Sequence, residues 1–187
     1  MLVTCNSYRN PELLADMART VDQLSGGRLY LGIGSGWFER DYTEYGYEFG
    51  TVGSRLDDLA AALPRITSRL SKLNPAPVRD IPILIGGQGE RKTLRLVAQY
   101  ADIWHGFTDA ETYPGKAEVL AGHCATTGRD PSTVERSSGV SGKTAEDVVA
   151  NAEALASLGV TLVTVGCNGP DYDLGPAQAL VEWRNAR

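Results

Sequence analysis

The residues best suited to bind an anion are Gly86, Gly87, Gln88 and Gly89, which follow a short apolar run. Glu90 and the two cations Arg91 and Lys92 come directly after them and begin a helical pattern at residues 90–100. Consecutive backbone N–H groups, a helix N-terminus and nearby cations all favour a phosphate group. The same residues also fit a tight strand-to-helix turn with its cations in solvent. Their place at the end of a strand favours phosphate binding.

A second glycine cluster, Gly32, Gly34 and Gly36, ends another apolar run and leads into Trp37 and Tyr42. Glycines remove side chains where a backbone must approach a neighbour closely, and the aromatic residues offer flat apolar surface. A planar cofactor would suit this place, although a strand packed tightly against a helix has the same pattern. Trp37 stands where a dinucleotide-binding fingerprint needs its third glycine, so a Rossmann site is disfavoured.

The chain has two histidines, and one of them ends a predicted strand. His105 is therefore a candidate acid, base or hydrogen-bond donor, whereas His123 lies in a helical pattern and is interpreted as structural. The sequence has no His-Glu-x-x-His motif, no clustered cysteines and no nucleophile elbow. Metal-dependent and serine hydrolases accordingly have little support, and no metal site is predicted.

Residues 137–144 nearly match a nucleotide-binding phosphate loop, since Gly142, Lys143 and Thr144 precede a helical pattern. Ser137 stands where the first glycine of that motif belongs, and no apolar strand ending in a magnesium-binding aspartate is evident. We therefore favour a capping box, in which Thr144 and Asp147 begin the helix.

Composition favours a single domain, residues 1–187, with small molecules or proteins as partners. A net charge of −5 argues against binding to nucleic acid or to an anionic membrane surface. The three cysteines are far apart and odd in number, which indicates a reducing, cytoplasmic setting. No segment has the length and apolarity of an export signal or a membrane span.

The elements that must position these residues alternate regularly between strands and helices. Strand patterns lie at 2–4, 28–33, 81–85, 101–107, 134–140 and 161–165, and helical patterns at 11–24, 54–73, 90–100, 112–127, 145–158 and 176–186. Pro64 predicts a kink or an early break in the second helix. Such alternation predicts parallel strands with ligand sites at their carboxyl ends. Six strands fall short of a barrel of eight, so we expect an α/β fold of the incomplete (β/α)8 type; an open doubly wound sheet is the rival.

The motifs taken in order resemble the bacterial luciferase-like monooxygenase family, in particular its actinobacterial branch that uses the deazaflavin coenzyme F420. They are residues 8–11, 22–28, 31–37, 83–89 and 100–104, which together span most of the chain. The resemblance implies a (β/α)8 barrel in which the isoalloxazine or deazaflavin ring lies at the carboxyl ends of the strands. It also implies that the phosphate tail lies on the late strand-to-helix loops.

The resemblance further implies particular cofactor contacts. Thr4 and Asn6 match strand-end positions near the ring, and Tyr42 matches an aromatic residue of the following loop. Gly86, Gly87, Gln88 and Gly89 match the phosphate-side loop, in agreement with the argument made from the residues alone. Trp37 and His105 are expected as further contacts.

Members of this family begin about two strands earlier, and Met1 stands where the third strand should already be under way. The chain is thus expected to be an internal start, a fragment or a shortened homologue, and an exposed strand edge favours a homodimer or larger homo-oligomer. The expected function is hydride transfer through F420, or alternatively FMN, to or from a small organic substrate. A non-catalytic cofactor-binding or oligomerisation protein derived from the same barrel is the alternative, and a phosphate-binding α/β protein unrelated to flavins is the third.

Overall fold

The fold is built on one parallel sheet, in a computed structural model that describes residues 2–187; the start at Met1 discussed above lies outside this range. Its strands are β1 (Thr4–Cys5), β2 (Leu31–Gly34), β3 (Ile83–Gly86), β4 (Ile103–His105), β5 (Glu135–Val140) and β6 (Leu162–Val165). They pair in the order of the sequence, from β1 to β6. A doubly wound sheet reverses its direction of growth at a switch point, so this order excludes that rival.

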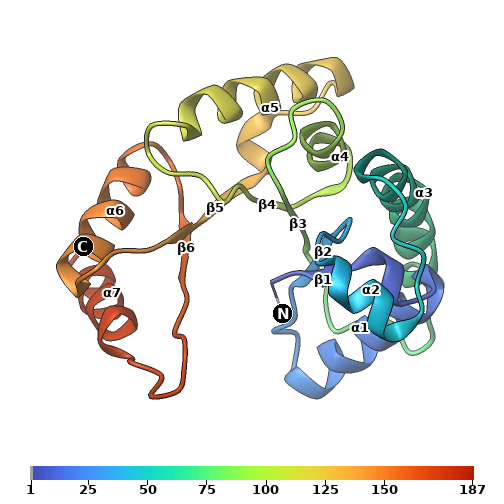
Figure 1. Ribbon diagram of the computed structural model, residues 1–187. Coiled ribbons are helices and arrows are strands. Elements are labelled where there is room, and N and C mark those ends of the chain that lie inside the picture. The colour runs from blue at the N-terminus through green and yellow to red at the C-terminus, as the bar shows by residue number, and fades with distance from the viewer. Residues whose placement is uncertain (1) are drawn as a thin grey trace.

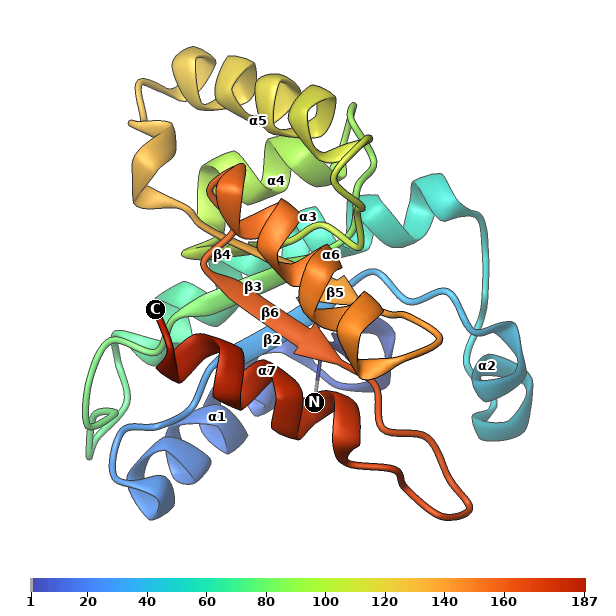
Figure 2. The same cartoon turned by 90° about the vertical axis from the view of Figure 1, so that its left-hand side faces the viewer.

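Helices cover the outer side of the curved sheet (Figure 1). They are α1 (Pro11–Ser25), α2 (Glu39–Tyr45), α3 (Val52–Leu70), α4 (Thr93–Tyr100), α5 (Tyr113–Thr127), α6 (Ala145–Ser157) and α7 (Gly175–Asn185). Figure 1 shows an open arc, in which β1 and α1 face β6 and α7 across a gap, and Figure 2 shows the β6–α7 end from the front. The expected incomplete (β/α)8 barrel is confirmed. Within residues 2–187, no helix combines the length and apolarity needed to cross a membrane.

Alternate residues of each strand face the helices and the barrel interior. Ile33, Ile85 and Trp104 are neighbours in register and are fully buried in the core between the sheet and the helices. The next residue of each strand points to the other side, so Gly86 and His105, also paired in register, face the interior. Glycines and a histidine therefore occupy the inward-facing positions at the carboxyl ends of these strands.

The predicted boundaries of α1 are confirmed in detail. The Asn10 side chain accepts hydrogen bonds from the N–H groups of Glu12 and Leu13, and Gly26 ends the helix with a φ of +67°. Pro64, in contrast, does not break α3, which continues to Leu70. Leu63 and Ile66 are fully buried on either side of this position, so packing holds both halves of the helix in place.

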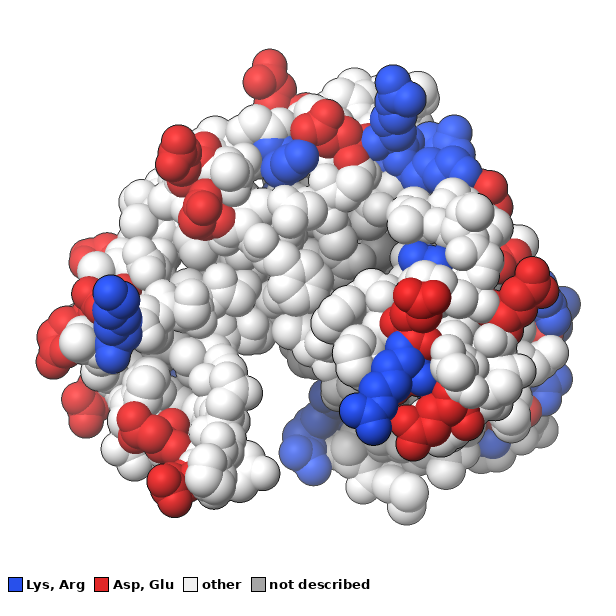
Figure 3. Space-filling view, in the orientation of Figure 1, with Lys and Arg blue, Asp and Glu red and all other residues white. Residues whose placement is uncertain are grey.

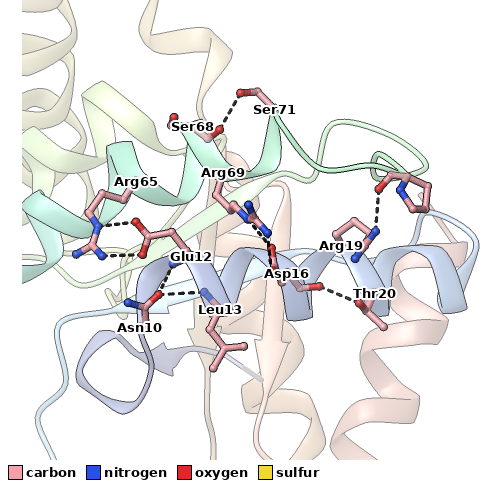
Figure 4. Close-up of polar contacts among 11 residues, drawn as sticks. Asn10, Glu12, Leu13, Asp16, Arg19, Thr20, Arg65, Ser68, Arg69 and Ser71 are labelled. Carbon is pink, nitrogen blue, oxygen red and sulfur yellow. Dashed lines mark hydrogen bonds and ion pairs between the residues drawn. The ribbon is translucent and has the colours of Figure 1, made fainter.

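Two ion pairs join α1 to α3, as Figure 4 shows. Arg65 donates hydrogen bonds of 2.8 and 2.6 Å to Glu12, and Arg69 donates bonds of 2.8 and 3.0 Å to Asp16. Each pair is offset from the other by four residues on both helices, which places the carboxylates and the guanidinium groups in matching rows. Hydrogen bonding to the arginines lowers the pKa of both carboxyl groups. The pairs align the two helices at the β1 end of the arc.

α2 is absent from the helices that the sequence predicts, and Tyr42 was expected on a loop. Tyr42 is the buried residue of this seven-residue helix, which therefore has no repeated apolar face for a pattern search to detect. The Arg55 guanidinium holds the segment around it, donating to the carbonyls of Gly36 (3.1 Å) and Phe49 (2.9 Å). This arginine is buried on α3 and lies 3.8 Å from the centre of the Phe49 ring.

Candidate functional site

Both glycine clusters end neighbouring strands, as expected for a site at the carboxyl ends. Gly34 ends β2 and Gly86 ends β3, and the two strands are paired. A Cβ on Gly34 would lie 2.9 Å from the Val3 side chain, and one on Gly86 would lie 3.3 Å from both Val3 and Phe107. These two glycines are therefore needed for close packing on the inner face. Phe107 is half exposed and lies on the loop after β4.

The loop after β3 presents three backbone donors in a row. The Gly87 N–H donates to the His105 carbonyl (3.0 Å), and the Gly87 carbonyl accepts from Trp104 Nε1 (2.7 Å). The N–H groups of Gln88, Gly89 and Glu90 donate to no acceptor within residues 2–187. Gly87 has a φ of +135°, which favours glycine. An anchored turn with adjacent unused N–H groups is the arrangement that binds an anion.

Of the two cations after this loop, only Arg91 remains without a partner in the described part of the chain. Lys92 Nζ lies 2.6 Å from Asp57 Oδ1 and 3.2 Å from the Gly53 carbonyl, both at the start of α3. Glu90 pairs with Lys116 of α5 at 2.7 Å. The loop is thus tied to α3 on one side and to α5 on the other, while the Arg91 guanidinium is exposed.

His105 is only 1% exposed and faces the barrel interior. Its Nδ1 lies 2.8 Å from Ser137 Oγ, and its Nε2 is buried without a partner among the described residues. Burial lowers the pKa of His105 to about 4, so the imidazole is neutral at pH 7. Phe107 packs against it with ring centres 4.3 Å apart.

The hydrogen bond to Ser137 decides which nitrogen of His105 carries the proton. If Nδ1 donated, the hydroxyl hydrogen of Ser137 would need another acceptor, and Ser137 Oγ makes no other hydrogen bond within residues 2–187. We therefore assign the hydroxyl as the donor to Nδ1 and the proton to Nε2. The site then offers a neutral N–H donor, 4.0 Å from where a Cβ on Gly139 would stand.

The two aromatic candidates after β2 differ in exposure. Trp37 is 81% exposed, and Tyr42 is 1% exposed. The Tyr42 hydroxyl lies 3.1 Å from Cys5 Sγ and 3.0 Å from Ser7 Oγ, and burial is the main cause that raises its pKa. Their contacts with a cofactor remain predictions.

Thr4 begins the two-residue strand β1 and Asn6 directly follows it, but their surroundings differ from those of His105. Thr4 is paired with Ile33 in the helix-facing row, and its hydroxyl accepts a hydrogen bond from Arg9 (3.1 Å). Asn6 is buried and lines a cavity of about 350 Å³ between the start of α1 and α3. The structure brings the 86–89 loop and His105 together and leaves the roles of Thr4 and Asn6 as predictions.

The near match to a nucleotide-binding loop is a helix cap. Asp147 accepts hydrogen bonds from the N–H groups of Lys143 (3.1 Å) and Thr144 (3.2 Å), and the Thr144 hydroxyl accepts from the Asp147 N–H (3.2 Å). The favoured capping interpretation is confirmed. These two N–H groups are occupied within the chain and do not form a phosphate cradle.

Charged side chains are spread over the outer helices in both signs (Figure 3). In the same view, the hollow between the two ends of the arc is lined mostly by uncharged residues. Within residues 2–187, no group of three or more His, Cys, Asp and Glu side chains is placed to hold a metal ion.

Comparison with known proteins identifies a matching family and one similar mycobacterial protein. Residues 2–166 match the family described as luciferase-like monooxygenase. An uncharacterized protein of Mycobacterium tuberculosis is 32% identical over 117 residues, which are 55% of this chain and 40% of that protein.

Two solved structures show the same fold at 16% sequence identity. An F420-dependent secondary alcohol dehydrogenase in complex with an F420-acetone adduct has a TM-score of 0.79 and matches 94% of this chain and 75% of that one. The oxygenating constituent of 3,6-diketocamphane monooxygenase from Pseudomonas putida, in complex with FMN, has a TM-score of 0.59. It matches 78% of this chain and 49% of that one. The chain thus spans less than half of the curated relative and three quarters of the first structure.

Proposed function

The chain belongs to the luciferase-like monooxygenase family, and on this basis we propose that it is an oxidoreductase that binds coenzyme F420 at the carboxyl ends of its strands. Its reaction would be hydride transfer to or from a small organic substrate, with FMN as the alternative cofactor. The observation that carries this proposal is that two sets of unused donors lie on neighbouring strand ends. One set is the backbone N–H groups of Gln88, Gly89 and Glu90, and the other is Nε2 of His105 on the next strand.

The loop at residues 86–90 fits the phosphate-bearing tail that F420 and FMN share. Its three unused N–H groups and the exposed Arg91 guanidinium are complementary to negative charge. When bound, either cofactor supplies the ring that accepts or donates the hydride. The protein's own contribution would be to hold the tail and position the ring.

His105 would orient a ligand oxygen inside the barrel. Its Nε2–H is a donor that stays uncharged at neutral pH, because protonation of the buried ring is disfavoured. A neutral donor suits a carbonyl or hydroxyl oxygen, and Ser137 keeps the ring in one orientation. Phe107, packed on the ring, would shield this hydrogen bond from water.

Cofactor titration tests the proposal directly. Fluorescence titration of the purified protein with F420 and with FMN should show binding, and Arg91→Gln should weaken it most at low salt. Arg95→Gln, which removes an exposed arginine one turn further along α4, is the matched control and should retain wild-type affinity. Absence of binding to both cofactors would refute the proposal.

Gly87→Asp should abolish cofactor affinity by placing a carboxylate where the phosphate is expected. Any side chain here is strained, since a Cβ would lie 2.9 Å from Thr93 Cγ2 and the φ is +135°. Gly87→Ala carries the same strain without the charge, so the difference between the two variants reports the phosphate site. Equal losses of affinity would show that the loop is misassigned.

A non-catalytic cofactor-binding or oligomerisation protein is the second candidate, because β1 and β6 are both edge strands of the sheet. Binding without turnover of bound cofactor by hydride donors would favour it. We also propose a cytoplasmic homodimer or larger homo-oligomer that binds a small-molecule substrate and no nucleic acid. Exposed strand edges support such association. Analytical ultracentrifugation would reject the oligomer if the protein sediments as a monomer.

A further inference from the structure

A groove on the outer face of the molecule, here called the α5–α6 groove, runs along α5 toward the end of α6. Its volume is about 760 Å³. Its lining comes from α5, from the start of β5 with the segment before it, and from the turn between α6 and β6. Its lining includes Tyr113, Ala117, Ala121, Val134, Arg136 and Leu158. The groove is thus separate from the loops at the carboxyl ends of the strands.

Arg136 brings an unpaired positive charge to this groove. Its Nη2 donates to the Pro131 carbonyl (3.0 Å), whereas its Nη1 is buried and has no partner within residues 2–187. The guanidinium lies 5.9 Å from the centre of the Trp104 ring. Glu135 is the carboxylate on the groove's lining, and it is exposed and accepts a hydrogen bond from Thr161 instead (3.0 Å). No described carboxylate forms an ion pair with Arg136.

Tyr113 adds a second donor beside the guanidinium. Its ring stacks on Trp104 with centres 5.9 Å apart and planes inclined by 18°. Burial raises the pKa of the Tyr113 phenol, and Arg136 opposes this effect, which places the two groups next to each other. The Tyr113 hydroxyl is not among the buried polar atoms that lack a partner, so it is open to the groove that this residue lines.

An arginine without an ion pair, next to a tyrosine hydroxyl in a groove, is a candidate site for an anion. A partly buried guanidinium without a counterion is unfavourable, and an acceptor with two oxygens could bond Arg136 Nη1 and the Tyr113 hydroxyl together. The alanine, valine and leucine side chains of the lining offer apolar surface beside them. Both the charge and the apolar surface would be matched by one amphipathic ligand.

We propose that the α5–α6 groove binds a small organic carboxylate, with its carboxylate on Arg136 and Tyr113 and its apolar body along Ala117 and Ala121. This site is distinct from the proposed cofactor site, because Arg136 faces the helices, whereas the adjacent Ser137 faces the barrel interior with His105. Its failure would leave the oxidoreductase proposal unchanged, and the reverse also holds.

Isothermal titration calorimetry with 4-phenylbutyrate and its neutral counterpart 4-phenylbutanamide tests the proposal. We expect the carboxylate to bind about tenfold or more tightly than the amide, because hydrogen bonds to a charged partner are lost in the amide. Arg136→Gln should remove this preference. Tyr113→Phe, which keeps the ring on Trp104, should weaken carboxylate binding several-fold.

Substitutions on α5 locate the binding site. Ala121→Phe should fill the groove and abolish binding, whereas Ala125→Phe, one turn away on an exposed position of the same helix, should leave it unchanged. Equal affinity for the carboxylate and the amide would overturn the proposal. So would binding of inorganic phosphate as tight as that of the carboxylate, or unchanged binding in both Tyr113→Phe and Ala121→Phe.

Discussion

Burial of His105 makes the stability of the protein depend on pH in a predictable direction. The pKa of the imidazole falls from 6.5 to about 4 on folding. Between these values the unfolded chain binds a proton that the folded protein does not, so stability decreases as the pH falls. Above about pH 6.5, histidine is neutral in both states and His105 makes no pH-dependent contribution.

The magnitude follows from the size of the shift. Each pKa unit is equivalent to about 1.4 kcal/mol, so the full effect over this window is about 3 kcal/mol. Between about pH 7 and pH 4.5, the part due to His105 is about 2 kcal/mol, because the folded form begins to protonate near the lower value. This is a sizeable fraction of the stability of a typical domain.

Urea unfolding at the two pH values measures this contribution. The loss of unfolding free energy on acidification should be about 2 kcal/mol smaller in His105→Gln than in the wild type. Carboxyl groups also titrate in this range, but their contribution is common to both proteins and cancels in the difference. His123→Gln, which removes the other histidine, is the control and should retain the wild-type dependence. A proton NMR titration of the unmodified protein gives the same pKa without any substitution.

Either of two results would refute this reasoning. One is an imidazole of His105 that titrates near 6.5 in the folded protein, which would mean that water reaches the ring. The other is an equal loss of stability on acidification in wild type and His105→Gln. Either result would also show that His105 is not shielded from water, as the proposed orientation of a ligand oxygen requires.

Three further predictions concern stability and the glycine loop. Thr144→Ala should lower the free energy of unfolding by about 1 kcal/mol, because the helix cap uses this hydroxyl and a nucleotide site does not. Thr144→Ser should restore most of the lost stability. Stabilisation of the wild type by ATP and magnesium in the same unfolding assay would contradict this prediction. Leu63→Ala, at a fully buried position, should cost about 2–5 kcal/mol in urea unfolding, against about 0.5 kcal/mol or less for the half-exposed Leu13→Ala. Trp104→Phe removes the donor to the Gly87 carbonyl, so it should destabilise the protein by about 1–3 kcal/mol and weaken cofactor binding; unchanged affinity in the folded variant would show that the loop does not need this anchor.

The features predictable from the sequence are those that depend on residues close together in the chain. Apolar runs ending in glycine located β2 and β3 to within a few residues, and the helical pattern at 11–24 located α1 to within one residue at each end. The 86–89 loop could be recognised for the same reason. The prediction that the helix breaks early at Pro64 was wrong, because burial on both sides of the proline outweighs the lost hydrogen bond.

The features that sequence reasoning missed depend on distant residues. His105 and Ser137 meet only because β4 and β5 pair in one particular register, and Ser137 had instead been considered as part of a phosphate-loop motif. Arg136 and Tyr113 come from a strand and a helix that pack on the same tryptophan. No local pattern contains that information, and only a prediction of strand register could have suggested the first pair.

The sequential order of the strands also has a consequence for how the chain folds. Every strand pairs only with strands adjacent to it in the sequence, so each connection closes its loop onto an element that directly precedes it. The entropy lost in loop closure is therefore divided into separate steps, with no pairing between the first and last segments of the sheet. Such a sheet can grow in the direction of synthesis, unit by unit, and each newly formed strand is the template for the next.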